Sequence, residues 1–174
     1  EASNWRSEES LAACLVKRGI PAIAGLDTRA LTSRLREKGT LKGFLSVTGV
    51  VGEADAVRLS REWGGLDGQD YAARVTCGKP YRWDPDGQRS SSWGFPAKLP
   101  PAGLKVVAYD FGIKWNILRG LRVSGMDVTV VPARTPAADV LKMKPAGVFL
   151  SNGPADQAAV TYAIEAGRAL LGKV

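Results

Sequence analysis

The second half of the chain alternates short apolar runs with amphipathic segments, and this alternation constrains the fold more than any other feature. The apolar runs have the length of strands, and between them apolar residues recur at helical spacing. The expected elements are strands over 106–111, 128–131 and 147–150 and helices over 113–123, 137–143 and 158–171. Strands that alternate with helices through short connections form a parallel sheet with right-handed crossovers. The sequence therefore predicts an α/β fold with a parallel-sheet domain over 104–174.

The predicted sheet is small. Three parallel strands are fewer than a full doubly wound sheet contains, so we expect this domain to be truncated, with a fourth strand due just after Val174. The last predicted strand would then present an apolar edge that a partner or further sequence covers.

The region before residue 84 shows a mixed pattern of elements. Ser7 followed by two glutamates is typical of a capped first helical turn, and Asp27 or Thr28 is in position to cap a second helix. The expected elements are helices over 7–18, 28–38 and 53–63 and a strand over 41–47. Residues 84–103 are rich in Pro, Gly and Ser and indicate a linker.

The composition excludes several classes of protein. The chain has no His, so it has no imidazole to serve as the general base of a Cys-His or Ser-His nucleophilic centre. Its two Cys are too few for a disulfide framework or a four-ligand zinc site, which favours a reducing cytoplasm and predicts no metal site. No apolar run approaches the roughly 20 residues that span a bilayer, so no membrane association is expected. The formal charge of +7 is spread over both halves of the chain, and we expect no nucleic-acid binding.

The segments that follow the three predicted strands are the candidate sites, because ligands of parallel sheets collect at the carboxyl ends of the strands. Asp110 after the first strand is either a ligand or, by the favoured interpretation, a cap, with Asn116 or Asp110 itself starting the next helix. After the second strand, Thr135 is predicted to cap a helix. After the third, residues 150–156 contain a Gly turn whose backbone N–H groups are candidates to stabilise an oxyanion. The alternative is an ordinary turn, with Asp156 in position to cap the following helix.

Neither cysteine is expected to be a nucleophile. Cys14 lies on a predicted helix among apolar residues, which is typical of a small core residue. Cys77 has Lys79 nearby to lower its pKa, but the chain supplies no base to assist it.

The order of several motifs resembles one family, the small, glutamine-hydrolysing subunit of carbamoyl-phosphate synthetase. The matching segments are 3–11, 25–32, 35–39, 79–83, 106–114, 116–119, 130–133 and 149–154. The Asp-Thr-Arg and Tyr-Asp-Phe-Gly segments are specific to this subunit, whereas Ser-Asn-Gly-Pro is shared more widely among class I glutamine amidotransferases. The chain thus resembles an internal piece of such a subunit that lacks both ends.

The resemblance implies a domain organisation and an activity. Residues 1–95 would be the later part of the N-terminal domain, 96–103 a linker, and 104–174 the start of a flavodoxin-like class I glutamine amidotransferase domain. In the family a Cys-His-Glu triad releases ammonia from glutamine. A large subunit, which uses ATP and Mg, joins this ammonia to bicarbonate to make carbamoyl phosphate for pyrimidine and arginine biosynthesis. The implied assembly is a cytoplasmic heterodimer whose small subunit needs no cofactor of its own.

The resemblance carries over two glutamine-binding positions and no catalytic residue. The family's nucleophile lies in a Gly-x-Cys-x-Gly-His elbow that neither Cys14 nor Cys77 matches, so the chain alone is expected to be inactive. The Gly153 N–H would help to form the oxyanion hole, and the backbone at Ala155 would contact glutamine. The family reads Gly-Pro-Gly-Asp-Pro where this chain has Ala155 and Gln157 in place of the second Gly and the last Pro. If the second Gly has a positive φ, Ala costs on the order of 1 kcal/mol there.

A second class of function also fits the absent His and the altered turn. A non-catalytic scaffold or interaction protein with the same fold would have kept the sheet and lost the triad. The two hypotheses differ in whether a Gly-x-Cys-x-Gly-His segment belongs to the same protein.

Overall fold

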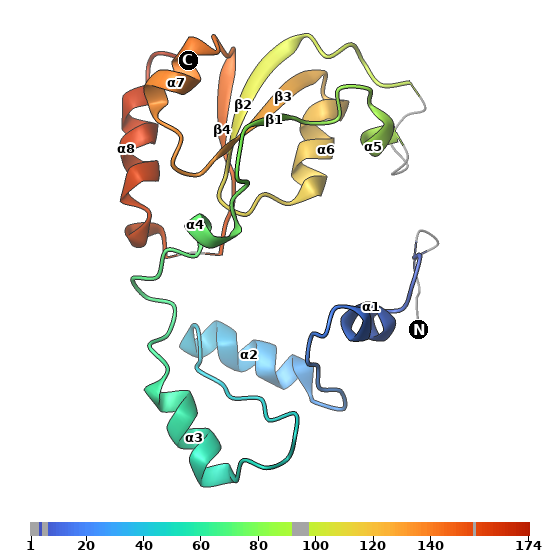
Figure 1. The fold of residues 1–174 in the computed structure, drawn as a ribbon, viewed down its shortest axis with the longest axis vertical. Coiled ribbons are helices and arrows are strands. Elements are labelled where there is room, and N and C mark those ends of the chain that lie inside the picture. The colour runs from blue at the N-terminus through green and yellow to red at the C-terminus, as the bar shows by residue number, and fades with distance from the viewer. Residues whose placement is uncertain (1–3, 5–6, 92–97, 155) are drawn as a thin grey trace. The chain divides into compact units, whose positions relative to one another are not determined.

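Figure 1 shows the computed structural model of the chain, which describes residue 4 and residues 7–91, 98–154 and 156–174. The chain divides into two compact units, Glu1–Gly65 and Leu66–Val174. In the part of the chain that the structure describes, no helix is both long and apolar enough to cross a membrane.

The first unit contains three helices, α1 (Leu11–Lys17), α2 (Thr28–Lys38) and α3 (Glu53–Glu62). The predictions for α2 and α3 are confirmed. Asp27 caps α2 as expected, because its carboxylate accepts a hydrogen bond from the Ala30 N–H at 2.9 Å. The predicted start of α1 is wrong: Ser10 rather than Ser7 is the N-cap, and its hydroxyl accepts from the Ala13 N–H.

The strand predicted over 41–47 does not form. This segment has no strand assignment, and the side chains of Leu41, Phe44 and Leu45 are each about 40% exposed. An apolar segment becomes a strand only when a neighbouring backbone pairs with it. No described residue of the first unit supplies such a partner, because its regular elements are all helices.

The second unit contains the remaining elements, most of which the sequence predicts. They are α4 (Ala72–Val75), β1 (Tyr81–Arg82), α5 (Gln88–Ser91), β2 (Leu104–Asp110), α6 (Trp115–Val123), β3 (Met126–Pro132), α7 (Ala137–Lys142), β4 (Gly147–Leu150), the 3₁₀ turn η1 (Gln157–Ala159) and α8 (Thr161–Leu170). The predicted final helix begins later than expected, because Gln157–Ala159 forms the 3₁₀ turn first.

The sheet has the order β1-β3-β2-β4. Strand β2 lies in the middle and pairs in parallel with β3 and with β4, with Ala108 opposite Val130 on one side and Phe149 on the other. Strand β1 adds an antiparallel edge to β3. The predicted α/β class is therefore confirmed, and the parallel, open sheet is consistent with a flavodoxin-like domain.

Side chains of β2 alternate between two cores, one on each face of the sheet. Val107, Tyr109 and Phe111 face the core shared with α7 and α8, whereas Ala108 faces the core shared with α6 and the buried Trp83. Figure 1 shows α6 on one side of the sheet and α7 and α8 on the other. This packing holds the carboxyl ends of the parallel strands together at one edge.

The compact units divide at a different point from the predicted domains. Residues 66–91 pack with the sheet. The side chain of Trp83 is 1% exposed, and its backbone N–H donates to the Val128 carbonyl at 2.8 Å. The physical reason is that the antiparallel pairing of β1 and the burial of one indole attach this segment to the second unit. The start of the predicted linker 96–103 lies outside the described residues, and the assignment of 1–95 and 104–174 to family domains stays a prediction.

Candidate functional site

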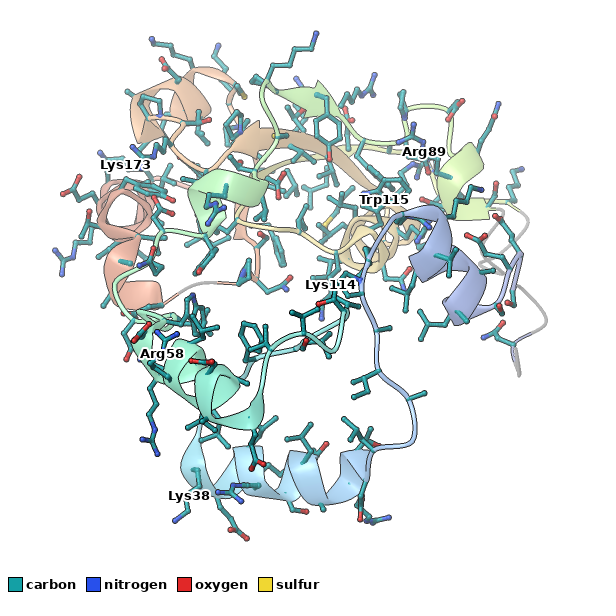
Figure 2. The ribbon with its side chains drawn as sticks, turned by 60° about the horizontal axis from the view of Figure 1, so that its bottom comes forward. Lys38, Arg58, Arg89, Lys114, Trp115 and Lys173 are labelled. Carbon is teal, nitrogen blue, oxygen red and sulfur yellow. The ribbon has the colours of Figure 1, made fainter. Side chains whose placement is uncertain are left out.

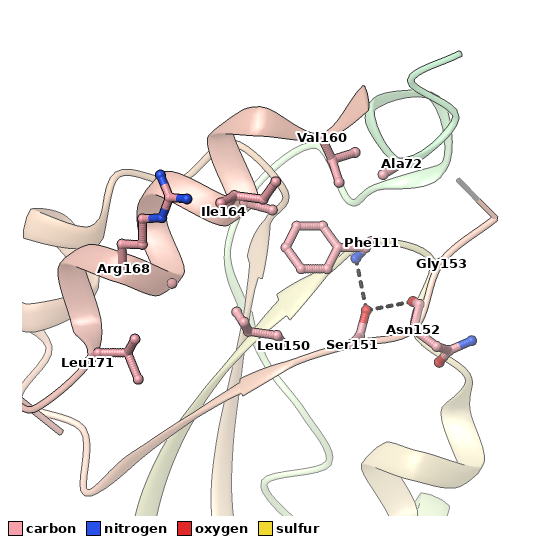
Figure 3. Close-up of a pocket in the computed structure, with 12 residues that line it drawn as sticks. Ala72, Phe111, Leu150, Ser151, Asn152, Gly153, Val160, Ile164, Arg168 and Leu171 are labelled. Carbon is pink, nitrogen blue, oxygen red and sulfur yellow. Dashed lines mark hydrogen bonds between the residues drawn. The ribbon is translucent and has the colours of Figure 1, made fainter. Parts of the chain in front are cut away.

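The loops after β2, β3 and β4 meet at the carboxyl edge of the sheet, where the sequence predicts a site. The turn after β4 is held against the end of β2 by two hydrogen bonds, and a third bond lies within the turn. The Ser151 N–H donates to the Tyr109 carbonyl at 3.3 Å, and the Ser151 hydroxyl accepts from the Phe111 N–H at 2.9 Å. The same hydroxyl donates to the Asn152 carbonyl at 2.8 Å (Figure 3). Ser151 therefore fixes the path of the backbone that leads into Gly153.

Gly153 lies directly against the loop after β2. A Cβ atom at this position would overlap the carbonyl oxygen of Phe111, so only glycine fits. Gly112 on the facing loop has a φ of +113°, and a Cβ there would lie 2.9 Å from Cδ of Pro154. The two loops thus interlock through two glycines that have no room for side chains.

The Gly153 backbone borders a cavity and has a donor to offer. No described residue accepts a hydrogen bond from the Gly153 N–H. The cavity measures about 480 Å³ and is lined by Gly153, Ser151 and Asn152 together with apolar side chains of β4 and α8 and with Arg168. Figure 3 shows Phe111 between the α8 side chain of Ile164 and the turn at Ser151. A carbonyl or carboxylate group of a small ligand fits this combination of an apolar wall and a backbone donor.

Asp110 has a structural role, as the favoured interpretation predicts, but it caps the loop after β2 and not the next helix. It is 7% exposed, and its Oδ1 accepts from the N–H groups of Gly112 and Ile113 at 2.9 Å each. Its Oδ2 accepts from the Cys77 N–H at 2.8 Å. It does not cap α6, whose N-cap residue is Lys114, and Asn116 lies inside that helix. Three backbone donors therefore hold the carboxylate, which fixes the loop after β2 and the segment at Cys77.

Thr135 is not the predicted cap of α7. Pro136 occupies the N-cap position, and the Thr135 hydroxyl donates to the Pro132 carbonyl at 2.8 Å. Proline supplies the extended backbone that precedes a helix, so Thr135 instead closes the turn before it. The sequence does not distinguish these roles, because a Thr before a Pro can either cap a helix or close the turn that precedes it.

The sequence predicts that Asp156 caps the following helix, but it caps the 3₁₀ turn η1 and not α8, because η1 comes first and Val160 is the N-cap residue of α8. Its Oδ1 accepts from the Ala158 N–H at 3.0 Å at the start of η1. Its Oδ2 also accepts from the Gly68 N–H at 3.3 Å, a contact that the sequence does not predict. Ala155, the second predicted glutamine-binding position, lies outside the described residues, and the expectation about its φ stays a prediction.

The two cysteines lie in different compact units. Cys77 is half-buried, and burial, together with the negative charge of Asp110, raises the pKa of its thiol. Cys14 lies on α1 in the first unit. Among the described residues, no group of three or more His, Cys, Asp or Glu side chains is arranged to hold a metal ion.

The positive charges lie on several different elements. Figure 2 shows Lys38, Arg58, Arg89, Lys114 and Lys173 as labelled examples, and Arg58 is paired with both Asp55 and Glu62 on its own helix. The absence of nucleic-acid binding stays a prediction.

Two parts of the chain are similar to known protein families. Residues 1–45 match the family model described as "Carbamoyl-phosphate synthase small chain, CPSase domain". Residues 107–174 match the model described as "Glutamine amidotransferase class-I". The second match covers β2 from Val107 onward, β3, β4 and the Gly153 turn, so the loops of the candidate site after these strands lie in the region that matches the amidotransferase model.

Individual relatives match nearly the whole chain. The carbamoyl phosphate synthase small chain of Pseudomonas aeruginosa is 47% identical over 176 residues, which cover 98% of this chain and 45% of that protein. The chloroplastic small chain of Oryza sativa subsp. japonica is 46% identical over 172 residues, which cover 99% of this chain and 38% of that protein. The small chain of Thioalkalivibrio sulfidiphilus is 48% identical over 169 residues, which cover 97% of this chain and 44% of that protein. The chain therefore spans less than half the length of these relatives.

Proposed function

We propose, because this chain belongs to the carbamoyl-phosphate synthase small-chain family, that it is part of a subunit that hydrolyses glutamine and delivers ammonia for carbamoyl phosphate synthesis. The observation that carries the proposal is the turn after β4 in the amidotransferase region. Its backbone is fixed by Ser151, packed against Phe111 and open to a cavity at Gly153.

The role of Gly153 in this proposal follows from its backbone. When a nucleophile attacks the side-chain amide of glutamine, negative charge develops on the amide oxygen, and a fixed N–H group stabilises that charge. The Gly153 N–H has no acceptor among the described residues and belongs to a rigid turn, so it suits this role. The backbone at Ala155 would contact the substrate two residues later. The Cys-His-Glu triad of the family would come from outside these 174 residues.

The partners follow from the same family membership. A large subunit would receive the ammonia and would hold the ATP and Mg, and the small subunit would need no cofactor. We place the assembly in the cytoplasm, as the cysteine content suggests, although the names of the plant relatives place those proteins in chloroplasts. The products would serve pyrimidine and arginine biosynthesis.

The test uses the complete small subunit that contains this chain, paired with its large subunit. Carbamoyl phosphate formation is measured with glutamine and, separately, with ammonia as the nitrogen source. We expect synthesis from both, with the glutamine amide nitrogen recovered in the product. Synthesis from ammonia alone would refute the proposed function, because it would show an intact large subunit that receives nothing from its partner.

The 174-residue chain alone should show no glutaminase activity. Its sequence has no His, and the raised pKa of Cys77 disfavours the reactive thiolate. The control is the double variant Cys14→Ser, Cys77→Ser, in which any thiol-dependent activity is abolished. Activity of the unmodified chain above that of the double variant would contradict this expectation.

The second candidate function is a non-catalytic scaffold with the same fold, which the absent His and Ala155 favour. It requires that the protein containing this chain lacks a Gly-x-Cys-x-Gly-His segment. Sequencing the C-terminal peptides of that protein distinguishes the two proposals.

A further inference from the structure

One segment contacts every loop at the carboxyl edge of the sheet. This segment, residues 66–77, is here named the strap, and it includes α4. It leads from the first compact unit into β1, and Figure 1 shows α4 at the end of the sheet where β2 finishes. Its hydrogen-bonding partners lie 33 to 92 residues away in sequence.

The strap is fixed first to the ends of β2 and β3. The Cys77 N–H donates to Oδ2 of Asp110 at 2.8 Å, at the end of β2. The Thr76 hydroxyl accepts from the Ala133 N–H at 2.9 Å, directly after β3. These two bonds anchor the C-terminal end of the strap to the two central strands.

The strap also reaches the turn that carries Gly153. The Gly68 N–H donates to Oδ2 of Asp156, three residues after Gly153. A Cβ atom on Gly112, the residue interlocked with Pro154, would lie 3.2 Å from Cγ2 of Val75. Ala72 is fully buried and lines the same cavity as Gly153 (Figure 3). The strap therefore limits where the loops after β2 and β4 can move.

Asp70 is the residue that joins the middle of the strap to the rest of the site. Its Oδ2 lies 2.9 Å from Nη2 of Arg134 after β3, and its Oδ1 accepts from the Tyr162 hydroxyl of α8 at 3.0 Å. The same Oδ1 accepts from the Ala73 N–H at 2.9 Å. The guanidinium of Arg134 also lies 4.9 Å from the centre of the Tyr162 ring. One carboxylate thus connects the strap, the loop after β3 and α8.

The charge of Asp70 is maintained by these donors. Burial raises the pKa of its carboxyl, but the Ala73 N–H, Arg134 and the Tyr162 hydroxyl outweigh that effect and hold the pKa below its ordinary value. These donors therefore favour the charged form of the carboxylate. A charged acceptor shared by three donors forms stronger hydrogen bonds than a neutral one.

We propose that Asp70, with Arg134 and Tyr162, is a positioning cluster that holds the strap across the carboxyl edge and thereby sets the Gly153 turn for glutamine. The inference rests on the proposed function. Asp70 itself does not line the cavity, so it acts through the turn and not by touching the substrate. An oxyanion donor that is displaced by a fraction of an ångström loses much of its effect on the transition state.

The test compares Asp70→Asn with Asp127→Asn in the complete small subunit paired with its large subunit. The two aspartates are matched, because each pairs with an arginine and their side chains are 22% and 20% exposed. Asp127 pairs with Arg82 near the amino end of β3, away from the strap. We expect Asp70→Asn to reduce kcat/KM for glutamine about tenfold while ammonia-dependent synthesis is unchanged, and Asp127→Asn to change neither.

Amide hydrogen exchange supplies a readout that does not depend on glutamine chemistry. In Asp70→Asn, exchange at the hydrogen-bonded N–H groups of Phe111, Gly112 and Ser151 should be at least several times faster, whereas Asp127→Asn should leave it unchanged. Tyr162→Phe removes one donor and keeps the ring, so it should show the same effects more weakly. It also serves as the test variant if Asp70→Asn does not fold.

The outcomes separate the two proposals. If the unmodified complex uses ammonia but not glutamine, the proposed function fails, and exchange alone then decides the positioning role. If glutamine kinetics and exchange of the turn are both unchanged in Asp70→Asn and Tyr162→Phe, the positioning cluster is refuted. An equal loss in the Asp127→Asn control would likewise overturn it, because the effect would then come from any lost ion pair of the unit.

Discussion

The backbone of Gly153 lies against the carbonyl group of Phe111 so closely that a side chain at position 153 has no space. The contact joins the turn after β4 to the loop after the central strand β2. Since the Phe111 N–H is also bonded to the Ser151 hydroxyl, the backbone N–H and the carbonyl group of Phe111 both contact the same turn. The position of the candidate oxyanion donor is therefore set by the central strand of the sheet.

Gly153→Ala should displace this turn. The added methyl group overlaps backbone, which cannot rotate away as a side chain does, so we expect a loss of about 1–3 kcal/mol in the free energy of unfolding. In the complete subunit, glutamine-dependent synthesis should fall by at least tenfold. Chemical denaturation and steady-state kinetics measure the two effects.

The matched control for this variant is Gly147→Ala in β4, the strand that leads into the turn. A Cβ atom at Gly147 meets no atom within 4 Å, so this substitution should leave both stability and glutamine use nearly unchanged. Equal behaviour of the two variants would show that the space around Gly153 is not restrictive.

Asp110→Asn should loosen the same edge by a different route. The Asp110 carboxylate accepts from three backbone N–H groups, of Cys77, Gly112 and Ile113. An amide has one acceptor oxygen and a donor group in place of the second, so at least one buried N–H loses its partner. We expect a loss of about 2–3 kcal/mol, measured by urea unfolding. Asp139→Asn, at an exposed ion pair with Lys142, is the comparison and should lower the free energy of unfolding by less than about 0.5 kcal/mol. Similar losses in the two variants would show that the hydrogen bonds of the Asp110 carboxylate do not hold this edge together.

The parallel strands could be predicted because their apolar runs are long enough to be recognised and are separated by helical patterns. Strand β1 could not, since Tyr81 and Arg82 pair with β3 over two residues and carry no alternating pattern. The segment 41–47 shows the opposite error: its apolar residues suggest a strand, but pairing depends on a partner that the local sequence does not specify.

The candidate site was predictable in part for the same reason. Only Ser151 and Asn152 separate Gly153 from the end of an apolar run, so its place near the strand end can be inferred from the order of residues. The contacts of the strap could not be inferred, because Asp70 contacts Arg134 and Tyr162 across 64 and 92 residues. The sequence of the strap also mixes polar and apolar residues without a clear periodicity. Such contacts depend on how the sheet brings distant loops to one edge.

Asp84→Asn should reveal a pH-dependent contribution from the turn between β1 and α5. Asp84 is 3% exposed, and its carboxylate accepts from the N–H groups of Arg89 and Ser90 at 2.9 Å each. Burial raises its pKa, but these hydrogen bonds outweigh burial and hold the pKa below the ordinary value of 3.8. Asn tolerates the positive φ of 45° at this position, so the backbone strain is not increased.

The sign of the pH effect follows from the lowered pKa. The charged form of Asp84 stabilises the fold above the pKa of the unfolded chain, and that stability is lost as the pH falls through the lower pKa of the folded state. The free energy of unfolding of Asp84→Asn should therefore be about 1–2 kcal/mol below that of the unmodified chain at neutral pH, and the difference should shrink below about pH 4. Asp86→Asn, at an exposed position of the same turn, is the control and should show a much smaller difference in the free energy of unfolding. A difference for Asp84→Asn that stays constant down to about pH 2 would contradict the lowered pKa of Asp84.

The thiol of Cys77 should react slowly in the folded chain. Burial and the nearby charge of Asp110 raise its pKa, and only the thiolate reacts rapidly with iodoacetamide. We expect alkylation of Cys77 at neutral pH to be at least about tenfold slower in the folded chain than in denaturant, as followed by mass spectrometry of the cysteine-containing peptides. In Asp110→Asn, reaction of Cys77 should accelerate more than reaction of Cys14, which lies on α1 in the other compact unit and serves as the internal reference. Equal acceleration of both thiols would show general loosening of the chain, and no acceleration of either would show that Asp110 does not control the environment of Cys77.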